Sequence, residues 1–199
     1  MARPPAPPLD RGLLPSLLGY ALRRTQSAVF ADFAATFARA GETLTPGEFG
    51  LLVLVAALLA SAIHPYDRPT WLLEVFPALI GVPILLWVDR RHHVTTLIFV
   101  LVVAHCLVLV YGGAYTYARV PLGLWMQEWF GFARNNYDKI GHFMQGFVPA
   151  LIARETLIRS ARLKDVRYIA FLCICVSLAV SAAYELIEWW AALLLGQGA

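Results

Sequence analysis

The stretch from 129 to 155, WFGFARNNYDKIGHFMQGFVPALIARE, places ionisable residues at the start of a segment that otherwise reads as a membrane-crossing helix. The helical segment begins near Tyr137, and Asp138, Lys139 and His142 all fall in its first two turns. Ionisable groups are costly in hydrocarbon, so their presence within such a helix needs a physical reason. The distribution of apolar and charged residues along the rest of the chain indicates what that reason is.

The composition is that of an integral membrane protein. Of the 199 residues, 59% are hydrophobic and 15% are charged, whereas soluble domains carry about 25% charged residues. Long apolar runs cover 50–63, 76–88, 94–110 and 168–184. We therefore predict an all-α fold, a multi-pass transmembrane helical bundle. The net charge of +3 does not indicate a nucleic-acid partner, because the basic residues lie in particular loops; the expected partner is the lipid bilayer.

About five spans are predicted, each close to the ~20 residues that cross a bilayer. They are 46–63, 71–88, 94–111, 137–158 and 167–195. The Pro-rich segment 1–12 (MARPPAPPLDRG) is predicted to be a disordered tail. Residues 13–45 are predicted to form an amphipathic interfacial helix, since Phe30, Phe33 and Phe37 share one face. The transmembrane bundle then occupies 46–199.

The distribution of Lys and Arg predicts the orientation. The N-terminal segment and the second and fourth loops hold twelve of these residues, whereas the first and third loops hold four. Cytoplasmic loops carry the excess of positive charge, so the N-terminus is predicted to be cytoplasmic.

On this topology the polar residues of the spans gather on the outer side. Seven of them fall in the outer part of the bilayer or at its outer surface: His64, Glu74, His105, Asp138, His142, Glu185 and Glu188. The inner halves of the first, third and fifth spans are almost purely apolar. Charges scattered at random would not segregate in this way, and we predict a polar pocket that opens to the outside.

Residue spacing places these groups on helix faces. Asp138 and His142 are four residues apart, Gln145 continues the same stripe, and Glu185 and Glu188 are three apart. Two facing helices could thus present a carboxylate and an imidazole opposite two carboxylates, as metal sites within helical bundles do. Asp138, His142, Glu185 and Glu188 could therefore hold a divalent metal such as Zn, Mn or Fe, or act as catalytic acids and bases without one.

A structural interpretation stands beside the functional one. Taken singly, each of these residues can be explained as an interhelical hydrogen-bond partner or as a charge at a helix end. The long third loop, YGGAYTYARVPLGLWMQEWFGFARNN, also has two interpretations. Its aromatic residues could anchor the protein at the membrane surface. Alternatively the loop could cover the pocket as a lid, with Tyr115 facing the pocket and with Gly112 and Gly113 supplying flexibility.

Common catalytic motifs are absent from the sequence. There is no G-x-S-x-G, H-E-x-x-H, Walker A or G-x-G-x-x-G pattern. The cysteines, Cys106, Cys173 and Cys175, lie inside apolar runs and are interpreted as small core residues rather than as a disulfide framework.

Four longer motifs carry a family resemblance. HPYDRPTWLLEVFP (64–77), GGAYTYARVPLG (112–123), the opening stretch (129–155) and YELIEWW (184–190) resemble the YjdF-like family of uncharacterised bacterial inner-membrane proteins. The resemblance covers 46–195 and implies a multi-pass protein of the bacterial inner membrane, without implying an activity. A shorter motif is similar to VanZ-like membrane proteins, whose D-K-x-x-H-F pattern matches Asp138, Lys139, His142 and Phe143. Glu185 corresponds to a glutamate on a later helix of those proteins.

The chain departs from the first family at its end. YjdF-like proteins continue past the YELIEWW helix with an acidic segment and a further span, whereas this sequence ends at Ala199. The resemblance therefore implies either a truncated chain or a variant that does not have that helix.

Three functions remain open on the sequence alone. The first is a membrane-embedded hydrolase or transferase that acts on a lipid or lipid-linked substrate, with or without a metal. The second is a proton-coupled carrier that relays protons through the same groups. The third is a non-catalytic subunit or assembly factor, whose polar face packs on membrane-protein partner subunits.

Overall fold

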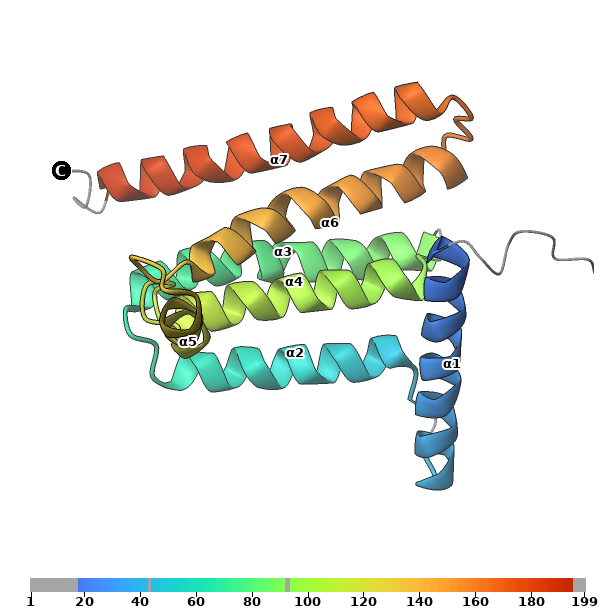
Figure 1. Cartoon of the computed structure of the whole chain (residues 1–199), viewed down its shortest axis with the longest axis horizontal. Coiled ribbons are helices and arrows are strands. Elements are labelled where there is room, and N and C mark those ends of the chain that lie inside the picture. Colours follow the sequence, from blue (N-terminus) through green and yellow to red (C-terminus); the bar gives the residue numbers. More distant parts are fainter. Residues whose placement is uncertain (1–17, 43, 92–93, 195–199) are drawn as a thin grey trace, which may run out of the picture. The chain divides into compact units, whose positions relative to one another are not determined.

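The computed structural model describes residues 18–42, 44–91 and 94–194, which form α-helices and no strand (Figure 1). The helices are α1 (Leu18–Arg39), α2 (Pro46–Ile63), α3 (Arg68–Arg91), α4 (Thr96–Ala114), α5 (Pro121–Phe130), α6 (Tyr137–Arg159) and α7 (Val166–Leu194). The predicted all-α multi-pass bundle is confirmed. The predicted tail 1–12 lies outside the described residues.

The chain divides into two compact units after Glu48. The described part of the first unit consists mainly of α1, where the rings of Phe33 and Phe37 lie 4.5 Å apart on the predicted shared face. The position of this helix at the membrane surface stays a prediction. A capping box ends the unit: Thr45 N donates to Glu48 Oε2 at 2.8 Å, and Glu48 N donates to Thr45 Oγ1 at 3.2 Å.

The second unit is built around α4, which packs against α3 and against α6, while α7 packs against α6. In the most apolar 18-residue stretch of α4, half of the residues are buried inside the protein. The corresponding share is 6% in α2 and 11% in α7. The buried residues Val102, Val103 and Cys106 of α4 form a core cluster with Val75 of α3 and Val148 of α6. The other helices expose large apolar side chains instead, such as Leu59 of α2 and Leu178 of α7. Surfaces of this kind fit a hydrocarbon solvent.

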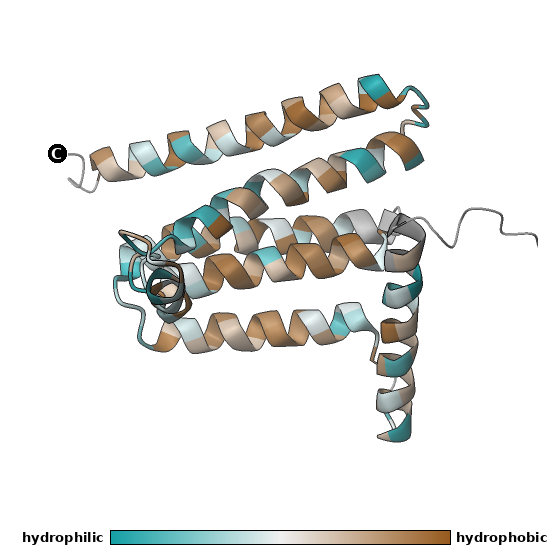
Figure 2. Ribbon diagram, in the orientation of Figure 1, coloured by the Kyte–Doolittle hydropathy of each residue, from teal (hydrophilic) through white to brown (hydrophobic). Residues whose placement is uncertain are grey.

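Within the described residues, four helices are long and apolar enough to cross a membrane: α2, α3, α4 and α7. Figure 2 shows apolar colouring along most of α2 and α4. The fifth predicted span corresponds to α6, whose 23 residues are long enough but include charged residues at both ends. By length and composition α6 is therefore not among the candidate spans, although it packs between α4 and α7. Its role as a fifth span stays a prediction.

Local sequence signals fix the end of the bundle that carries α5, hereafter the α5 end. Asp67 caps α3 by accepting a 2.9 Å hydrogen bond from Thr70 N. Tyr66 N donates to Ala114 O at 3.0 Å and ties the α2–α3 connection to the end of α4. The segment after Tyr111 is predicted to be a loop, and α5 is a helix that this prediction did not include. Pro121 in its first turn and Gly131 at its C-cap, with φ of 65°, are typical helix start and stop signals.

Candidate functional site

A pocket of about 200 Å³ lies at the α5 end, where α3, α4, α6 and α7 meet the segment that follows α4. This polar pocket is lined by Thr70, Glu74, Leu109, Thr116, Tyr117, Asp138, Gly141, His142, Gln145, Tyr184 and Glu188. Five of the residues singled out from the sequence are among them: Glu74, Asp138, His142, Gln145 and Glu188. The structure thus brings side chains from three helices, remote in sequence, to one place.

A hydrogen bond between α7 and α3 forms one wall. The Tyr184 hydroxyl donates to Glu74 Oε2 at 3.0 Å, across 110 residues of sequence. Glu188 lies one turn after Tyr184 on α7, so both side chains reach the same pocket. Tyr184 is not among the residues singled out from the sequence. The signal was available, because Tyr184 and Glu188 are four residues apart and therefore share a face.

Tyr117 forms a second wall and is held in an unusual backbone conformation. Its φ of 52° lies in the left-handed region, as does that of Thr116, which is uncommon for residues other than glycine. Burial raises the pKa of the Tyr117 hydroxyl, and the nearby Glu74 carboxylate raises it further. The phenol therefore stays protonated and can act as a hydrogen-bond donor. Nothing in the local sequence indicated this placement, which depends on the turn after α4.

The two glycines before this turn have a different role from the one expected. Gly112 and Gly113 are buried residues of α4 rather than part of a flexible lid. A Cβ on Gly112 would lie 2.4 Å from the Tyr117 ring, and one on Gly113 would lie 2.9 Å from Cβ of Glu74. A Cβ added to Gly141 of α6 would lie 3.1 Å from the same ring. Close packing of Tyr117 and Glu74 against the helices explains these glycines.

His142 forms the third wall. Its Nδ1 lies 3.5 Å from Oε1 of Glu185 on α7, at the long end of an ion-pair or hydrogen-bond contact. Both side chains are more than half exposed, and Glu185 does not itself line the pocket. A partner on Nδ1 leaves Nε2 as the nitrogen available to a reacting molecule.

Asp138 and Gln145, the other two polar α6 residues of the pocket, have protein partners. Asp138 accepts a 2.9 Å hydrogen bond from Arg134 one turn earlier. Gln145, which is 7% exposed, donates to the Ser181 carbonyl of α7 at 3.5 Å. Ser177 donates to the Gly146 carbonyl at 2.7 Å. The contacts of Gln145 and Ser177 are interhelical hydrogen bonds between α6 and α7, as the structural interpretation expected, so Gln145 both lines the pocket and joins two helices.

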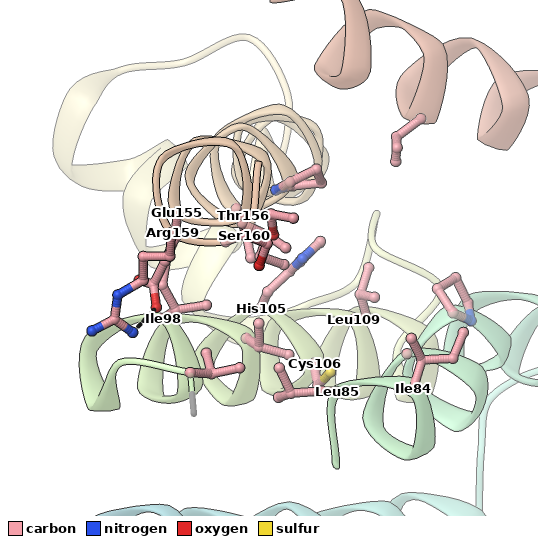
Figure 3. Close-up of a pocket in the computed structure, with 18 residues that line it drawn as sticks. Ile84, Leu85, Ile98, His105, Cys106, Leu109, Glu155, Thr156, Arg159 and Ser160 are labelled. Carbon is pink, nitrogen blue, oxygen red and sulfur yellow. Dashed lines mark hydrogen bonds and ion pairs between the residues drawn. The ribbon is translucent and has the colours of Figure 1, made fainter. Parts of the chain in front are cut away.

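Three of the residues singled out from the sequence lie elsewhere. His64 and Tyr115 line a separate cavity of about 730 Å³ between α2 and α4. His105 faces a third cavity of about 620 Å³, formed mainly by α3, α4 and α6 (Figure 3). Their positions in or beside the predicted spans put these residues at a similar depth in the membrane. These positions could not tell which side of α4 each one faced.

The described residues contain no group of three or more His, Cys, Asp or Glu side chains arranged to hold a metal ion. In particular, Asp138 is engaged by Arg134 and Glu185 points to His142 from outside the pocket. The acid–base use of these residues needs no such cluster.

The comparisons with known proteins agree with this architecture. Residues 48–199 match the family described as "Predicted membrane protein (DUF2238)". The chain belongs to this family. It is also 52% identical over 148 residues to the inner membrane protein YjdF of Escherichia coli (strain K12), an alignment that covers 74% of this chain and 71% of that protein. No solved structure matches the chain.

Membership confirms the resemblance to YjdF-like proteins. Together with four helices suited to crossing a membrane, it supports a multi-pass protein of the bacterial inner membrane. The aligned region of the family begins at residue 48 and so contains every residue of the polar pocket.

Proposed function

We propose that the polar pocket is the active site of a membrane-embedded enzyme, a hydrolase or transferase that acts on a lipid or lipid-linked substrate. The observation that carries this proposal is the convergence of Glu74, Tyr184, Glu188 and His142, from three helices, in one pocket beside Tyr117. Interhelical hydrogen bonds alone would satisfy these groups in separate pairs. Their gathering around a shared cavity instead provides acids, a base and donors to one bound molecule.

In a hydrolysis, His142 is the proposed general base. Its Nε2 takes a proton from a water molecule as the water oxygen attacks an ester or phosphoester of the substrate. Glu188, in its acid form, gives a proton to the oxygen that leaves. Tyr117 is the proposed hydrogen-bond donor for the negative charge that develops on the substrate, whereas the Tyr184 hydroxyl donates to Glu74 and holds that carboxylate in place. Glu185 is a positioning residue, because it acts through the Nδ1 atom of His142.

The predicted topology places this pocket at the outer side of the inner membrane, with the N-terminus in the cytoplasm. The substrate would then be drawn from the outer leaflet.

A proton-coupled carrier is supported less well. Further inward than Gln145, the cavity beside α4 is lined mainly by apolar residues, which do not relay protons. Partner subunits are compatible with the proposal, since the exposed apolar faces of α2 and α7 can meet lipid or another protein equally.

The test is turnover in a defined membrane. The full chain is reconstituted in vesicles made from bacterial polar lipid extract, and lipid products are followed by mass spectrometry. His142→Ala and Glu188→Gln should each lower the rate by about 10²- to 10⁴-fold, the usual contribution of a general acid or base. Glu128→Gln, at an exposed position of α5 outside the pocket, is the matched control. No wild-type conversion of any lipid in the extract would refute the proposal.

A second comparison tests the positioning role of Glu185. Glu185→Gln keeps an oxygen that can accept from the imidazole, whereas Glu185→Leu removes it. We expect Glu185→Leu to lower kcat with little change in KM. The kcat of Glu185→Gln should lie much closer to that of the wild type. Equal activity of the Leu and Gln variants would remove Glu185 from the mechanism.

A further inference from the structure

The apolar cavity behind the polar pocket has no role in the acid–base chemistry. It measures about 620 Å³, within the range of small-molecule sites. On α6 its lining runs from Val148 to Ser160, about 18 Å of helix. This length exceeds half of the ~30 Å hydrocarbon core of a bilayer. The cavity therefore has the dimensions of a chain that reaches through one leaflet.

The apolar cavity continues directly from the polar pocket on four helices. Leu109 of α4 lines both. On each of the other three helices, a residue that lines the polar pocket is followed, about one turn further inward on the same face, by a residue that lines the apolar cavity. The pairs are Glu74 and Pro77, Gln145 and Val148, and Tyr184 and Val180. The two cavities are neighbours that share Leu109, so together they place a polar end beside an apolar body, which matches the form of an amphiphile.

One polar atom interrupts the apolar body. His105 Nε2 is buried and has no hydrogen-bond partner, and Figure 3 shows the imidazole directed from α4 into the cavity. A buried polar atom without a partner is rare and calls for an explanation. Leu109, shared with the polar pocket, lies one turn away from His105, about 6 Å along the helix. A ligand would therefore offer a polar atom at this depth, just below its head group.

The charged side chains at the far end of the cavity pair with other groups of the protein. Glu155 accepts hydrogen bonds from Thr95 N at 2.9 Å and from Thr95 Oγ1 at 2.6 Å, and it pairs with Arg159 at 3.0 Å. These groups are satisfied by one another, so they do not require a charged end on the ligand. The occupant needs a head group only at the α5 end.

We propose that the apolar cavity binds one acyl chain of a glycerolipid whose head group lies in the polar pocket and whose ester carbonyl accepts a hydrogen bond from His105. This inference rests on the proposed lipid-directed function and specifies its substrate class. A polyprenyl phosphate would fill the apolar body equally well. It carries no polar atom one turn below the phosphate and leaves His105 Nε2 without a partner.

Photo-crosslinking tests the binding of the chain. The probe is a phosphatidylglycerol that carries a diazirine on one acyl chain, in vesicles with the full-length protein. Gly81 lines the cavity, and a Cβ there meets nothing within 4 Å, so Gly81→Phe places a ring in the cavity without a backbone clash. Leu79→Phe is the matched control, because Leu79 lies on the exposed face of the same helix. We expect crosslinks to peptides of α4 and α6, lowered at least fivefold by Gly81→Phe and unchanged by Leu79→Phe.

The ester contact is tested by competition. Unlabelled ester-linked phosphatidylglycerol should displace the probe about two- to tenfold better than its ether-linked analogue, the preference that one hydrogen bond provides. His105→Leu should abolish this preference while the crosslink remains. Equal crosslinking in all three proteins of the first experiment, or stronger competition by a polyprenyl phosphate, would overturn the proposal.

The two proposals fail separately. His142→Ala and Glu188→Gln should retain the crosslink even where they abolish turnover, because the labelled acyl chain lies in the apolar cavity, whereas both residues line the polar pocket of the head group. Crosslinking without any wild-type turnover would refute the enzyme and leave the lipid site. Turnover without crosslinking in the cavity would refute the lipid site alone.

Discussion

The Tyr184 hydroxyl on α7 donates a 3.0 Å hydrogen bond to Oε2 of Glu74 on α3. The main packing partner of α7 is α6, and that of α3 is α4. This bond therefore joins two helices of the bundle that are not main packing partners of each other. Because the same two side chains line the polar pocket, one contact both shapes the site and ties α7 to α3.

Removal of that hydroxyl should weaken the folded state. Tyr184→Phe removes one hydrogen-bond donor from the half-buried Glu74, and we expect a loss of about 1 kcal/mol, within the range for interhelical hydrogen bonds in membrane proteins. The measurement is thermal unfolding in detergent. Tyr168→Phe, at an exposed position of α7, serves as the control. A double-mutant cycle with Glu74→Gln isolates the contact, and a coupling energy near zero would show that the bond does not hold α7.

Alanine substitutions at Gly112 of α4 and at Gly81 of α3 should change the stability of the folded protein in opposite directions. Gly112→Ala places a Cβ 2.4 Å from the Tyr117 ring, and we expect a loss of about 1–3 kcal/mol from overpacking. Gly81→Ala meets nothing within 4 Å and should gain up to about 1 kcal/mol from helix propensity. Thermal unfolding of both variants checks the pair. A combined Gly112→Ala, Tyr117→Ala variant should recover part of the loss if the ring is the cause.

The cap of α3 should make stability depend on pH in the acid range. Hydrogen bonds from the Thr70 side chain and backbone lower the pKa of Asp67 from its usual 3.8. The charged carboxylate therefore stabilises the folded state above the unfolded pKa, and this contribution is lost as the pH falls through the lower folded pKa. Asp67→Asn keeps a cap that does not titrate, so its melting temperature should fall less than that of the wild type between pH 5 and about 3. Melting temperatures that fall equally with pH in the wild type and in Asp67→Asn would contradict the assignment of this pH dependence to Asp67.

The two ends of α6 should lie on opposite sides of the membrane. In a variant with the three cysteines replaced by serine, Ala133→Cys precedes α6 and Ala161→Cys follows it, and both positions are exposed. A maleimide that does not cross membranes, added to whole cells with a permeabilised outer membrane, should label Ala133→Cys but not Ala161→Cys. Labelling of Ala161→Cys alone would reverse the predicted orientation. Equal labelling of both would show that α6 does not span.

Much of the fold followed from local physical chemistry. The apolar runs and their flanking charges gave helix boundaries within three residues of α2, α3, α4, α6 and α7, because length and hydropathy decide which segments can lie in hydrocarbon. The capping box of Thr45 and Glu48 at the start of α2 is a further local signal, and it was not part of the prediction. The residues Asp138, His142 and Gln145 were placed on one face by helical periodicity alone, and all three line the polar pocket.

The tertiary structure decided which of these faces meet. Periodicity gives the spacing of residues along one helix but not the rotation of that helix against its neighbours. His105 thus faces an apolar cavity and Tyr115 a different one, although depth in the membrane suggested a common pocket. Tyr117 enters the site through a left-handed turn and through the absence of side chains on Gly112 and Gly141. Such contacts depend on how closely three helices approach, and the sequence of any one helix does not contain that distance.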